Sequence, residues 1–447
     1  MAKSRLFYEK EELKTYPIGG RRVWLLFIVI LANFIAAYEA QISPVVPMLL
    51  DGLKMTLTEY GLISCASIIA AAISAVIFGP IADRHGRVRF LVPSLFLTAI
   101  CVFLMSTVDT VMGLLMVRVL LGLVEGVSIS TTAGLVRDFS PRMGRALAYG
   151  FWTFGPVGSN FFANALAAWT LPIFLTWESQ FIIQGVIALV SSILILFNIR
   201  DLSPELRSHV ISNLDQVENV NKVVQNVKKE QKQKSGEMLR VPRIWALSIG
   251  ISLFLLTYLT IQSFGTTLLV QAFGYDNAEA ASIAQYFWTL NLFTLLIAGW
   301  ISDKLRLRKI ISLIGAILSL GYMMYFATLV GTDIAEGQLI IATAMLGGLM
   351  GIAYGPWMAL FSENAEDIKA SLQASAWGLW GFIIRVVAIA IVLISPVIVG
   401  SGSGWDTWLW VCALGGLVYI PLLFSAKGPW FNRSLSEETV PPPEMIG

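Results

Sequence analysis

The chain has 447 residues, of which 56% are hydrophobic and only 13% are charged, and its formal net charge is +2. A soluble domain carries about 25% charged residues, so this composition excludes an ordinary soluble protein and predicts an integral membrane protein. The small net charge gives no reason to expect a nucleic-acid partner.

Cysteine and histidine are scarce. The three cysteines lie in apolar segments and there are only two histidines, so we expect neither a disulfide framework nor a bound metal or cofactor. The charged N-terminal stretch is not followed by a small-residue cleavage site. We therefore expect the first hydrophobic run to remain in the mature protein.

Twelve apolar runs follow one another along the chain. Several exceed the ~20 residues that a membrane-spanning helix needs, whereas barrel strands span about ten. Backbone polar groups inside a bilayer must be paired within their own segment, so each run is predicted to be a helix. The runs lie at 23–50, 58–82, 90–107, 111–137, 146–170, 180–199, 243–273, 278–302, 310–331, 338–361, 370–399 and 406–426.

Basic residues alternate from one connection to the next. Lys and Arg gather before the first run and after every second run, whereas the other connections are acidic, with Lys54 as their only base. Because cytoplasmic loops are enriched in Lys and Arg, both termini are predicted to be cytoplasmic.

A polar stretch at 213–238, rich in Gln and Lys and without aromatic residues, divides the runs into six and six. It cannot bury a core and is predicted to be a cytoplasmic linker. The expected domains are an N-terminal segment, a first bundle, a linker, a second bundle and a tail, at 1–22, 23–199, 200–242, 243–426 and 427–447.

The loops after the second and eighth runs repeat one pattern. Gly79 and Asp83 in the first loop match Gly299 and Asp303 in the second, and both pairs are offset by 220 positions. The glycine permits close helix approach, and the aspartate can cap a neighbouring helix N-terminus. Such a repeat predicts two similar halves.

The first loop, with Asp83-Arg84-His85-Gly86-Arg87-Val88-Arg89, resembles the loop signature of the major facilitator superfamily. The resemblance implies an all-α membrane protein with twelve transmembrane helices in two pseudo-symmetric six-helix bundles. The bundles would rock around a central site near the midplane. It also implies that these loops form a cytoplasmic gate, a role assigned to Gly79, Asp83, Arg84, Arg87 and Asp303.

Four ionisable residues lie well inside apolar runs: Glu39, Arg118, Glu125 and Arg385. A charge at bilayer depth costs ~2.5–3.5 kcal/mol on insertion scales, so these residues are expected to face water, a substrate or one another. Arg118 and Glu125 are seven residues apart, close to two helical turns, and therefore share one helix face.

Each of the four has a functional and a structural interpretation. Arg385 is the strongest candidate for an anionic substrate, because a guanidinium is always charged and its fork matches a carboxylate. Arg118 contacts substrate or has a structural or coupling role. Glu125 and Glu39 are candidate proton carriers. Alternatively, Glu125 is permanently paired, Glu39 is solvated at the helix mouth, and Arg385 pairs with one of these acids.

The Arg118-x6-Glu125 spacing is similar to the fourth helix of the anion:cation symporter branch of the superfamily, which implies proton-coupled uptake of carboxylates. That branch usually carries an Asp-Arg pair in its first helix. Here the stretch is Asn33-Phe34-Ile35-Ala36-Ala37, and Glu39 further along is the candidate substitute. The basic residue of the eleventh run is also reminiscent of oxalate/formate exchangers.

Polar and aromatic residues in other runs are candidates for lining the cavity, although a single aromatic residue there more often serves packing. The set consists of Tyr38, Gln41, Tyr258, Gln262, Tyr286, Trp288, Asn291, Trp377 and Trp380. Acids near the end of the tenth run are expected to pair with the basic loops: Glu363, Glu366 and Asp367.

A competing signal lies in the fifth run, where Gly155-Pro156-Val157-Gly158-Ser159 is similar to a motif of proton-linked drug exporters. It can also be a simple packing kink. The leading hypothesis is proton-coupled import of a small organic anion, and the alternative is a proton antiporter that exports an organic compound. No enzyme motif is present. We expect a monomer in the lipid bilayer of the plasma membrane, such as a bacterial inner membrane, with the substrate and protons as its partners.

Overall fold

The computed structural model describes residues 12–37, 42–139, 151–152, 154–203, 206, 240–369, 373–400 and 404–431, without the side chains of Asp83, Arg137, Glu366, Lys369 and 373–375. Regular structure in these ranges is almost entirely helical. The single isolated bridge joins Leu13 to Leu202, where the Leu13 N–H donates to the Asp201 carbonyl at 2.8 Å. The chain is thus an all-α membrane protein.

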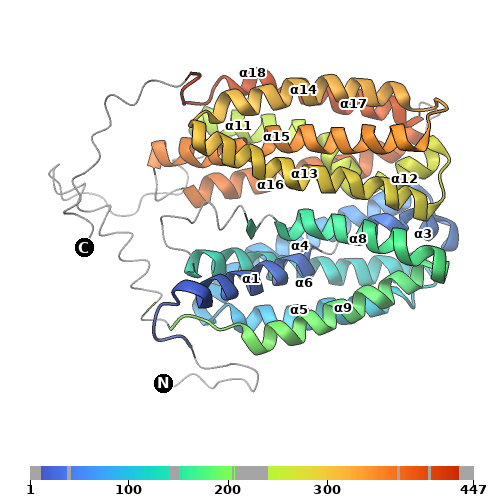
Figure 1. Cartoon of the computed structure of the whole chain (residues 1–447). Helices are drawn as coiled ribbons and strands as arrows, with labels where there is room; N and C mark the ends of the chain where they lie inside the picture. Colours follow the sequence, from blue (N-terminus) through green and yellow to red (C-terminus); the bar gives the residue numbers. More distant parts are fainter. Residues whose placement is uncertain are drawn as a thin grey trace.

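One group of helices comes from the first part of the chain and lies in the lower half of Figure 1. It contains α1 (Gly19–Ala36), η1 (Ser43–Val45), α3 (Val46–Gly52), α4 (Leu57–His85), α5 (Val88–Met105), α6 (Val111–Phe139), α8 (Phe154–Phe174) and α9 (Trp177–Asn198).

A second group occupies the upper half of the same view. It contains α11 (Pro242–Phe254), α12 (Leu256–Phe273), α13 (Asn277–Leu305), α14 (Arg308–Leu329), α15 (Glu336–Lys369), α16 (Gln373–Ile398), α17 (Gly404–Leu417) and α18 (Tyr419–Leu423). We call the end at which α4 and α13 finish the linker end, and the end at which they begin the far end.

Eleven segments among the described residues are long and apolar enough to cross a membrane. They match eleven of the twelve predicted runs. The remaining run corresponds to α8, a helix of 21 residues in which Ser159, Asn160 and Asn164 lower the hydropathy. Its predicted start, together with the predicted linker, lies outside the described residues, so twelve spans and cytoplasmic termini stay predictions.

The expectation of one helix per run is wrong in three places. In the first run, α1 ends at Ala36, and the 3-10 turn of η1 and the short α3 follow, with Pro44 and Pro47 near their starts. Proline has no N–H to continue a helical ladder. The run at 243–273 is interrupted at Leu255, and the last run is divided between α17 and α18.

The repeat predicted from the two loops extends over whole helices. Helices α4 and α13 each have 29 residues, and each begins with a capping box, Thr56 with Glu59 and Asp276 with Glu279. In such a box the cap side chain and the third residue satisfy each other's free backbone amides. Both ends of α4 and α13 keep the offset of 220 positions seen in the loops.

Glycines allow α6 to pack closely against α4 in the first group, and α15 against α13 in the second. A Cβ added to Gly122 of α6 would lie 2.3 Å from the Ser67 carbonyl oxygen of α4. A Cβ on Gly347 of α15 would lie 2.1 Å from the Phe287 carbonyl oxygen of α13. Small residues at such crossings let backbones approach closely in membrane proteins.

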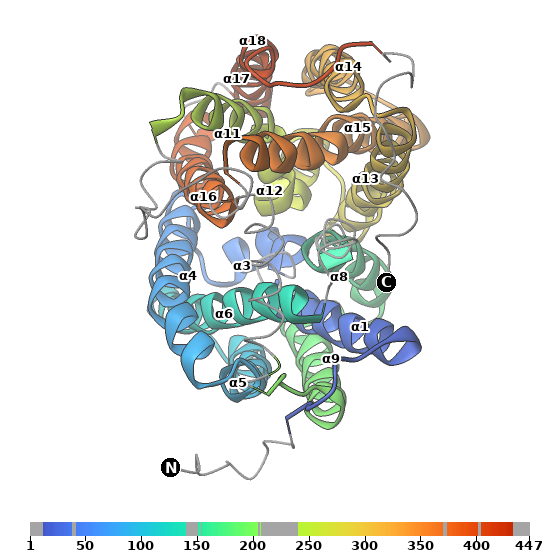
Figure 2. The same cartoon turned by 90° about the vertical axis from the view of Figure 1, so that its left-hand side faces the viewer.

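The two groups meet mainly toward the far end. A Cβ on Gly61 of α4 would lie 2.0 Å from the Val392 carbonyl oxygen of α16. The rings of Tyr60 and Phe264 lie 6.0 Å apart, edge to face. Apolar residues of α8 and α13 form a further joint cluster there. Figure 2, viewed from the linker end, shows α4, α3 and α8 bordering α16, α12 and α13.

Candidate functional site

Arg118 is held between α6 and α4. Its side chain is 1% exposed, and its Nη2 donates to the Ser64 Oγ at 3.4 Å. Ser67 of α4 donates to the Arg118 carbonyl oxygen at 2.8 Å. The close approach at Gly122 makes both contacts possible. The guanidinium therefore lies in the α4–α6 interface.

Glu125 follows Arg118 on the same stripe of α6, two turns along and rotated by about 20°. It is half-buried. Gly122 and Gly126 flank this stripe on the side that contacts α4. The helix geometry thus agrees with the expected shared face for Arg118 and Glu125. Glu39, the other predicted proton carrier, lies outside the described residues.

Arg385 lies in the middle of α16 and is half-buried. Its Nη1 donates to the Gly381 carbonyl oxygen at 3.0 Å, one turn back on the same helix. Among the residues that the structure describes, no carboxylate forms an ion pair with this guanidinium.

Helical spacing places Arg385 on the side of α16 that faces the other group. Val392 and Pro396, which contact Gly61 of α4, follow it by seven and eleven residues, so all three share one stripe. Arg385 is about 10 Å from that contact along the axis, toward the linker end. Ser64, the partner of Arg118, lies one turn from Gly61 in the same direction. Both arginines therefore lie close to one contact between the groups.

Eight aromatic residues form a continuous cluster, which we call the ring cluster, across α12, α13, α15 and α16. Tyr258 lies 5.0 Å from Trp288, and Trp377 lies 5.5 Å from Trp380, measured between ring centroids. The members are Tyr258, Phe287, Trp288, Tyr354, Trp357, Phe361, Trp377 and Trp380. Four of the predicted lining residues are thus brought together.

The other predicted lining residues are scattered. Asn291 is fully buried and donates from Nδ2 to the Gly347 carbonyl oxygen at 2.9 Å, which ties α13 to α15. Tyr286 is 39% exposed on α13, and Gln262 is half-buried on α12. Tyr38 and Gln41 lie outside the described residues.

The predicted gate loop of the first group contains a buried ion pair that the sequence pattern did not reveal. Arg87 is 1% exposed, pairs with Asp138 at the end of α6, and donates to the Gly134 carbonyl oxygen at 2.9 Å. Asp138 was missed because it stands beside ordinary loop charges in the sequence. The pair fastens the start of α5 to the end of α6.

A second acid missed at sequence level, Asp201, caps the N-terminus of α5. Its carboxylate accepts from the Arg87 N–H at 3.3 Å and the Val88 N–H at 2.9 Å. The first amides of a helix have no intrahelical partner and carry a partial positive charge, so a carboxylate there is stabilising. Gly79 lies near Ser130 of α6, Arg84 is exposed, and the Asp83 side chain lies outside the description.

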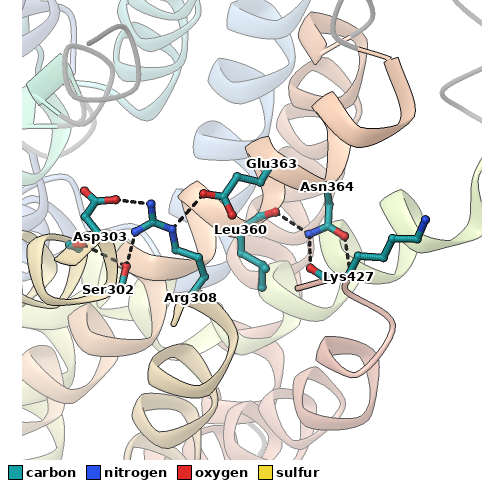
Figure 3. A network of polar contacts seen from close by, with 8 residues as sticks. Ser302, Asp303, Arg308, Leu360, Glu363, Asn364 and Lys427 are labelled. Carbon is teal, nitrogen blue, oxygen red and sulfur yellow. Dashed lines mark hydrogen bonds and ion pairs between the residues drawn. The ribbon is translucent and has the colours of Figure 1, made fainter. Parts of the chain in front are cut away.

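The matching corner of the second group is drawn in Figure 3. Arg308 pairs with Asp303, donates from Nε to Glu363 Oε1 at 3.1 Å and from Nη1 to the Ser302 Oγ at 2.8 Å. Arg308 joins the α13–α14 turn to the end of α15. Of the other predicted acids near this end of α15, Asp367 is exposed and the Glu366 side chain lies outside the description.

The same corner holds a cavity of about 400 Å³. It opens at the linker end of the second group and is bounded by the turn after α13, the end of α15 and the segment after α18. Its lining consists of Asp303, Arg306, Arg308, Lys309, Leu360, Glu363, Gly428 and Pro429.

The Gly-Pro sequence of the fifth run lies at the start of α8, packed on α1. A Cβ on Gly155 would lie 2.5 Å from Asn33 Nδ2, and that same nitrogen donates to the Trp152 carbonyl oxygen at 3.0 Å. Gly155 therefore serves a close helix contact.

The fold has two groups of helices in which α4 and α13 correspond, and an arginine ion pair stabilises the loop after each of these helices. Ionisable residues also lie inside the apolar spans. Together these features indicate a membrane transporter. The family description Major Facilitator Superfamily matches residues 24–391, and the chain belongs to this family. It is therefore a transporter and not an enzyme.

Two relatives illustrate the range of cargo in the family. The chain is 23% identical over 353 residues to the 4-hydroxybenzoate transporter PcaK of Pseudomonas aeruginosa, covering 74% of this chain and 76% of that one. It is 29% identical over 152 residues to the multidrug export protein EmrB of Haemophilus influenzae, covering 34% of this chain and 30% of that one.

Among solved structures, the fold matches a bacterial homologue of the human lysosomal transporter Spinster in an inward-facing, unoccupied conformation. The TM-score is 0.64 at 14% identity, over 92% of this chain and 95% of the other. The likeness establishes the major facilitator fold.

Proposed function

We propose that this transporter imports a small organic anion, of the carboxylate type, together with protons, by alternating access. The observation that carries the proposal is Arg385, a half-buried guanidinium within a span, on the side of α16 that faces the other group. No acid among the described residues forms an ion pair with it.

An arginine in this position needs an anion or water. Its charge is permanent, and its placement at bilayer depth costs ~2.5–3.5 kcal/mol on insertion scales. A substrate carboxylate would neutralise it with two parallel N–H···O bonds, which are among the strongest in proteins. Arg118, near the same contact between the groups, is the candidate second cationic contact or coupling residue.

Proton coupling is assigned to Glu125, with Glu39 as the second candidate. Burial raises the affinity of a carboxyl group for a proton, and a neighbouring cation lowers it. When Arg118 turns from Glu125 to an arriving anion, Glu125 gains a proton. This exchange of partners would link substrate and proton movement through one pair of residues on α6.

The two corners at the linker end are proposed to act as the cytoplasmic gate. In each group a buried or partly buried arginine, Arg87 or Arg308, fastens a loop to the end of the next long helix. Rigid corners let each bundle move as one body. We propose the domain boundaries 23–199 and 243–426 for these bodies, a bacterial inner membrane as the location, and a monomer as the working unit.

The relative named as a 4-hydroxybenzoate transporter supports an organic anion as cargo. The test uses the full-length protein in liposomes, with labelled succinate, gluconate, glutamate and benzoate and an imposed inward proton gradient. We expect one of these probes to accumulate, and Arg385→Gln to weaken its uptake roughly 10- to 100-fold, as expected when a charge-assisted bond is lost.

The matched control is Arg240→Gln, which removes an exposed cation at the start of the second group. It should leave uptake unchanged. Accumulation that ignores the proton gradient, or an Arg385→Gln variant as active as the parent, would overturn the proposal.

The second candidate function is proton-driven export of an organic compound. It is favoured by the similarity to EmrB and by the Gly155-Pro156 sequence. Overexpression would then raise resistance to toxic cations such as ethidium, and everted vesicles would accumulate them without any dependence on Arg385.

A further inference from the structure

The ring cluster has an inner and an outer layer. Phe287, Trp288, Trp357 and Phe361 are at most 1% exposed, whereas Tyr258, Tyr354, Trp377 and Trp380 are only half-buried. The outer rings come from α12, α15 and α16, and α12 and α16 border the first group of helices (Figure 2). The cluster therefore has accessible ring surface on the helices that border the other group.

Two hydrogen-bond donors in the cluster are unused. The indole N–H groups of Trp357 and Trp380 are buried and have no acceptor among the described residues. Their ring centroids are 5.6 Å apart. A buried indole N–H usually finds a partner, because leaving it unpaired away from water is costly. Trp357 is 0% exposed, so these donors lie beneath the outer rings and form a polar layer behind the accessible ring surface.

Arg385 lies on the same helix as two rings of the cluster. It follows Trp377 by eight residues and Trp380 by five, about 12 Å and 7.5 Å along the axis, and lies further toward the far end. Eight residues turn the helix by about 80° and five by about 140°, so Trp377 is the ring nearer to the side of Arg385. Half-buried ring surface and a guanidinium without an acidic partner among the described residues thus occur within little more than two turns of α16. Their combined chemistry fits a flat ring that carries a carboxylate.

We propose that the anion carried by this protein is an aromatic carboxylate, whose ring lies against the outer rings of the cluster while its carboxylate pairs with Arg385. This inference rests on the proposed function and narrows its substrate class. Stacked and edge-to-face ring pairs have a favourable quadrupole geometry that a saturated ring lacks. The site therefore distinguishes planar from puckered acids of equal charge.

The experiment compares benzoate with cyclohexanecarboxylate, which has the same charge and ring size but is puckered and has no π face. Binding to the purified full-length protein is measured by calorimetry, and competition is measured in the liposome uptake assay. We expect benzoate to bind roughly 3- to 10-fold more tightly, the range of a single aromatic pair.

Variants separate the two parts of the site. Trp377→Leu should abolish the preference for benzoate, and Trp377→Phe should keep most of it because a ring remains. The control Trp169→Leu, at a 73% exposed tryptophan on α8, should leave the preference intact. Arg385→Gln should weaken both acids alike.

The outcomes distinguish the two levels of proposal. Equal binding of both acids by the unmodified protein, with both weakened in Arg385→Gln, would overturn the aromatic inference and leave anion transport standing. Binding of neither acid would count against the aromatic inference. If succinate, gluconate and glutamate also fail to bind, both the aromatic inference and the proposed function are contradicted. The comparison of the two acids uses the unmodified protein, so it tests the inference even if a variant fails to fold.

Discussion

Asn364, near the end of α15, forms hydrogen bonds with both backbone groups of Lys427. Its Oδ1 accepts from the Lys427 N–H at 2.8 Å, and its Nδ2 donates to the Lys427 carbonyl oxygen at 3.0 Å (Figure 3). The neighbouring Lys309 donates to the Ala426 carbonyl oxygen at 2.7 Å and lies 4.0 Å from the Trp430 ring centroid. The segment after α18 is therefore fastened to the same corner as the Asp303–Arg308–Glu363 network.

This clamp predicts an effect of Asn364→Ala on stability. The variant leaves two backbone groups without their partners at a site where Asn364 is 1% exposed. We expect a loss of about 1–3 kcal/mol, seen as a lower midpoint of thermal unfolding in detergent.

The control for this clamp is Lys427→Ala. The clamp holds the backbone of Lys427, and its side chain is exposed, so this variant should unfold at the parent temperature. An equal drop in both variants would mean that the segment is held by other contacts.

The ion pair of Arg87 and Asp138 predicts strong non-additivity. Either single change, Arg87→Met or Asp138→Leu, leaves one charge buried without its partner and should cost about 3–5 kcal/mol. The double variant buries no charge and should recover much of that loss. Unfolding midpoints of the four proteins complete the cycle. Simple addition of the two losses would show that the pair does not act as a unit.

The close contact of α4 and α6 predicts that Gly122→Ala is harmful. The new Cβ would lie 2.3 Å from the Ser67 carbonyl oxygen, so the backbones must separate, at a cost of about 1–3 kcal/mol. Gly321→Ala on α14 is the matched control, because nothing lies within 4 Å of its Cβ position. In that helix alanine should be neutral or stabilising. Identical unfolding of the two variants would argue against tight packing at Gly122.

The proposed coupling residue predicts a separation of exchange from driven uptake. Glu125→Gln keeps the shape of the side chain and cannot bind or release a proton at neutral pH. Uptake driven by a proton gradient should fall at least 10-fold, while exchange of labelled for unlabelled substrate across the membrane should continue. Glu178→Gln, at a half-buried acid in the first turn of α9, far from Glu125 in the sequence, is the control. Gradient-driven uptake that survives in Glu125→Gln would assign coupling elsewhere.

Hydropathy and the repeated loop predicted the class of protein and the major facilitator family correctly. Both signals are local, because each apolar run must pair its own backbone, and the loop motif is a short string of residues. The same local reasoning failed where a helix ends inside an apolar run, as after Ala36 and at Leu255, because hydropathy does not mark such an end. By contrast, the seven-residue spacing correctly placed Arg118 and Glu125 on one stripe of α6, because both lie within a single uninterrupted helix.

The partners of individual side chains were decided by the tertiary structure alone. Asp138 and Asp201 meet Arg87 and the start of α5 only because the ends of α6 and α9 come to lie beside that loop. Tyr258 and Trp380 join one cluster although more than a hundred positions separate them. Sequence periodicity fixes which face of a helix a residue occupies, and only the packing of helices against one another determines what that face meets.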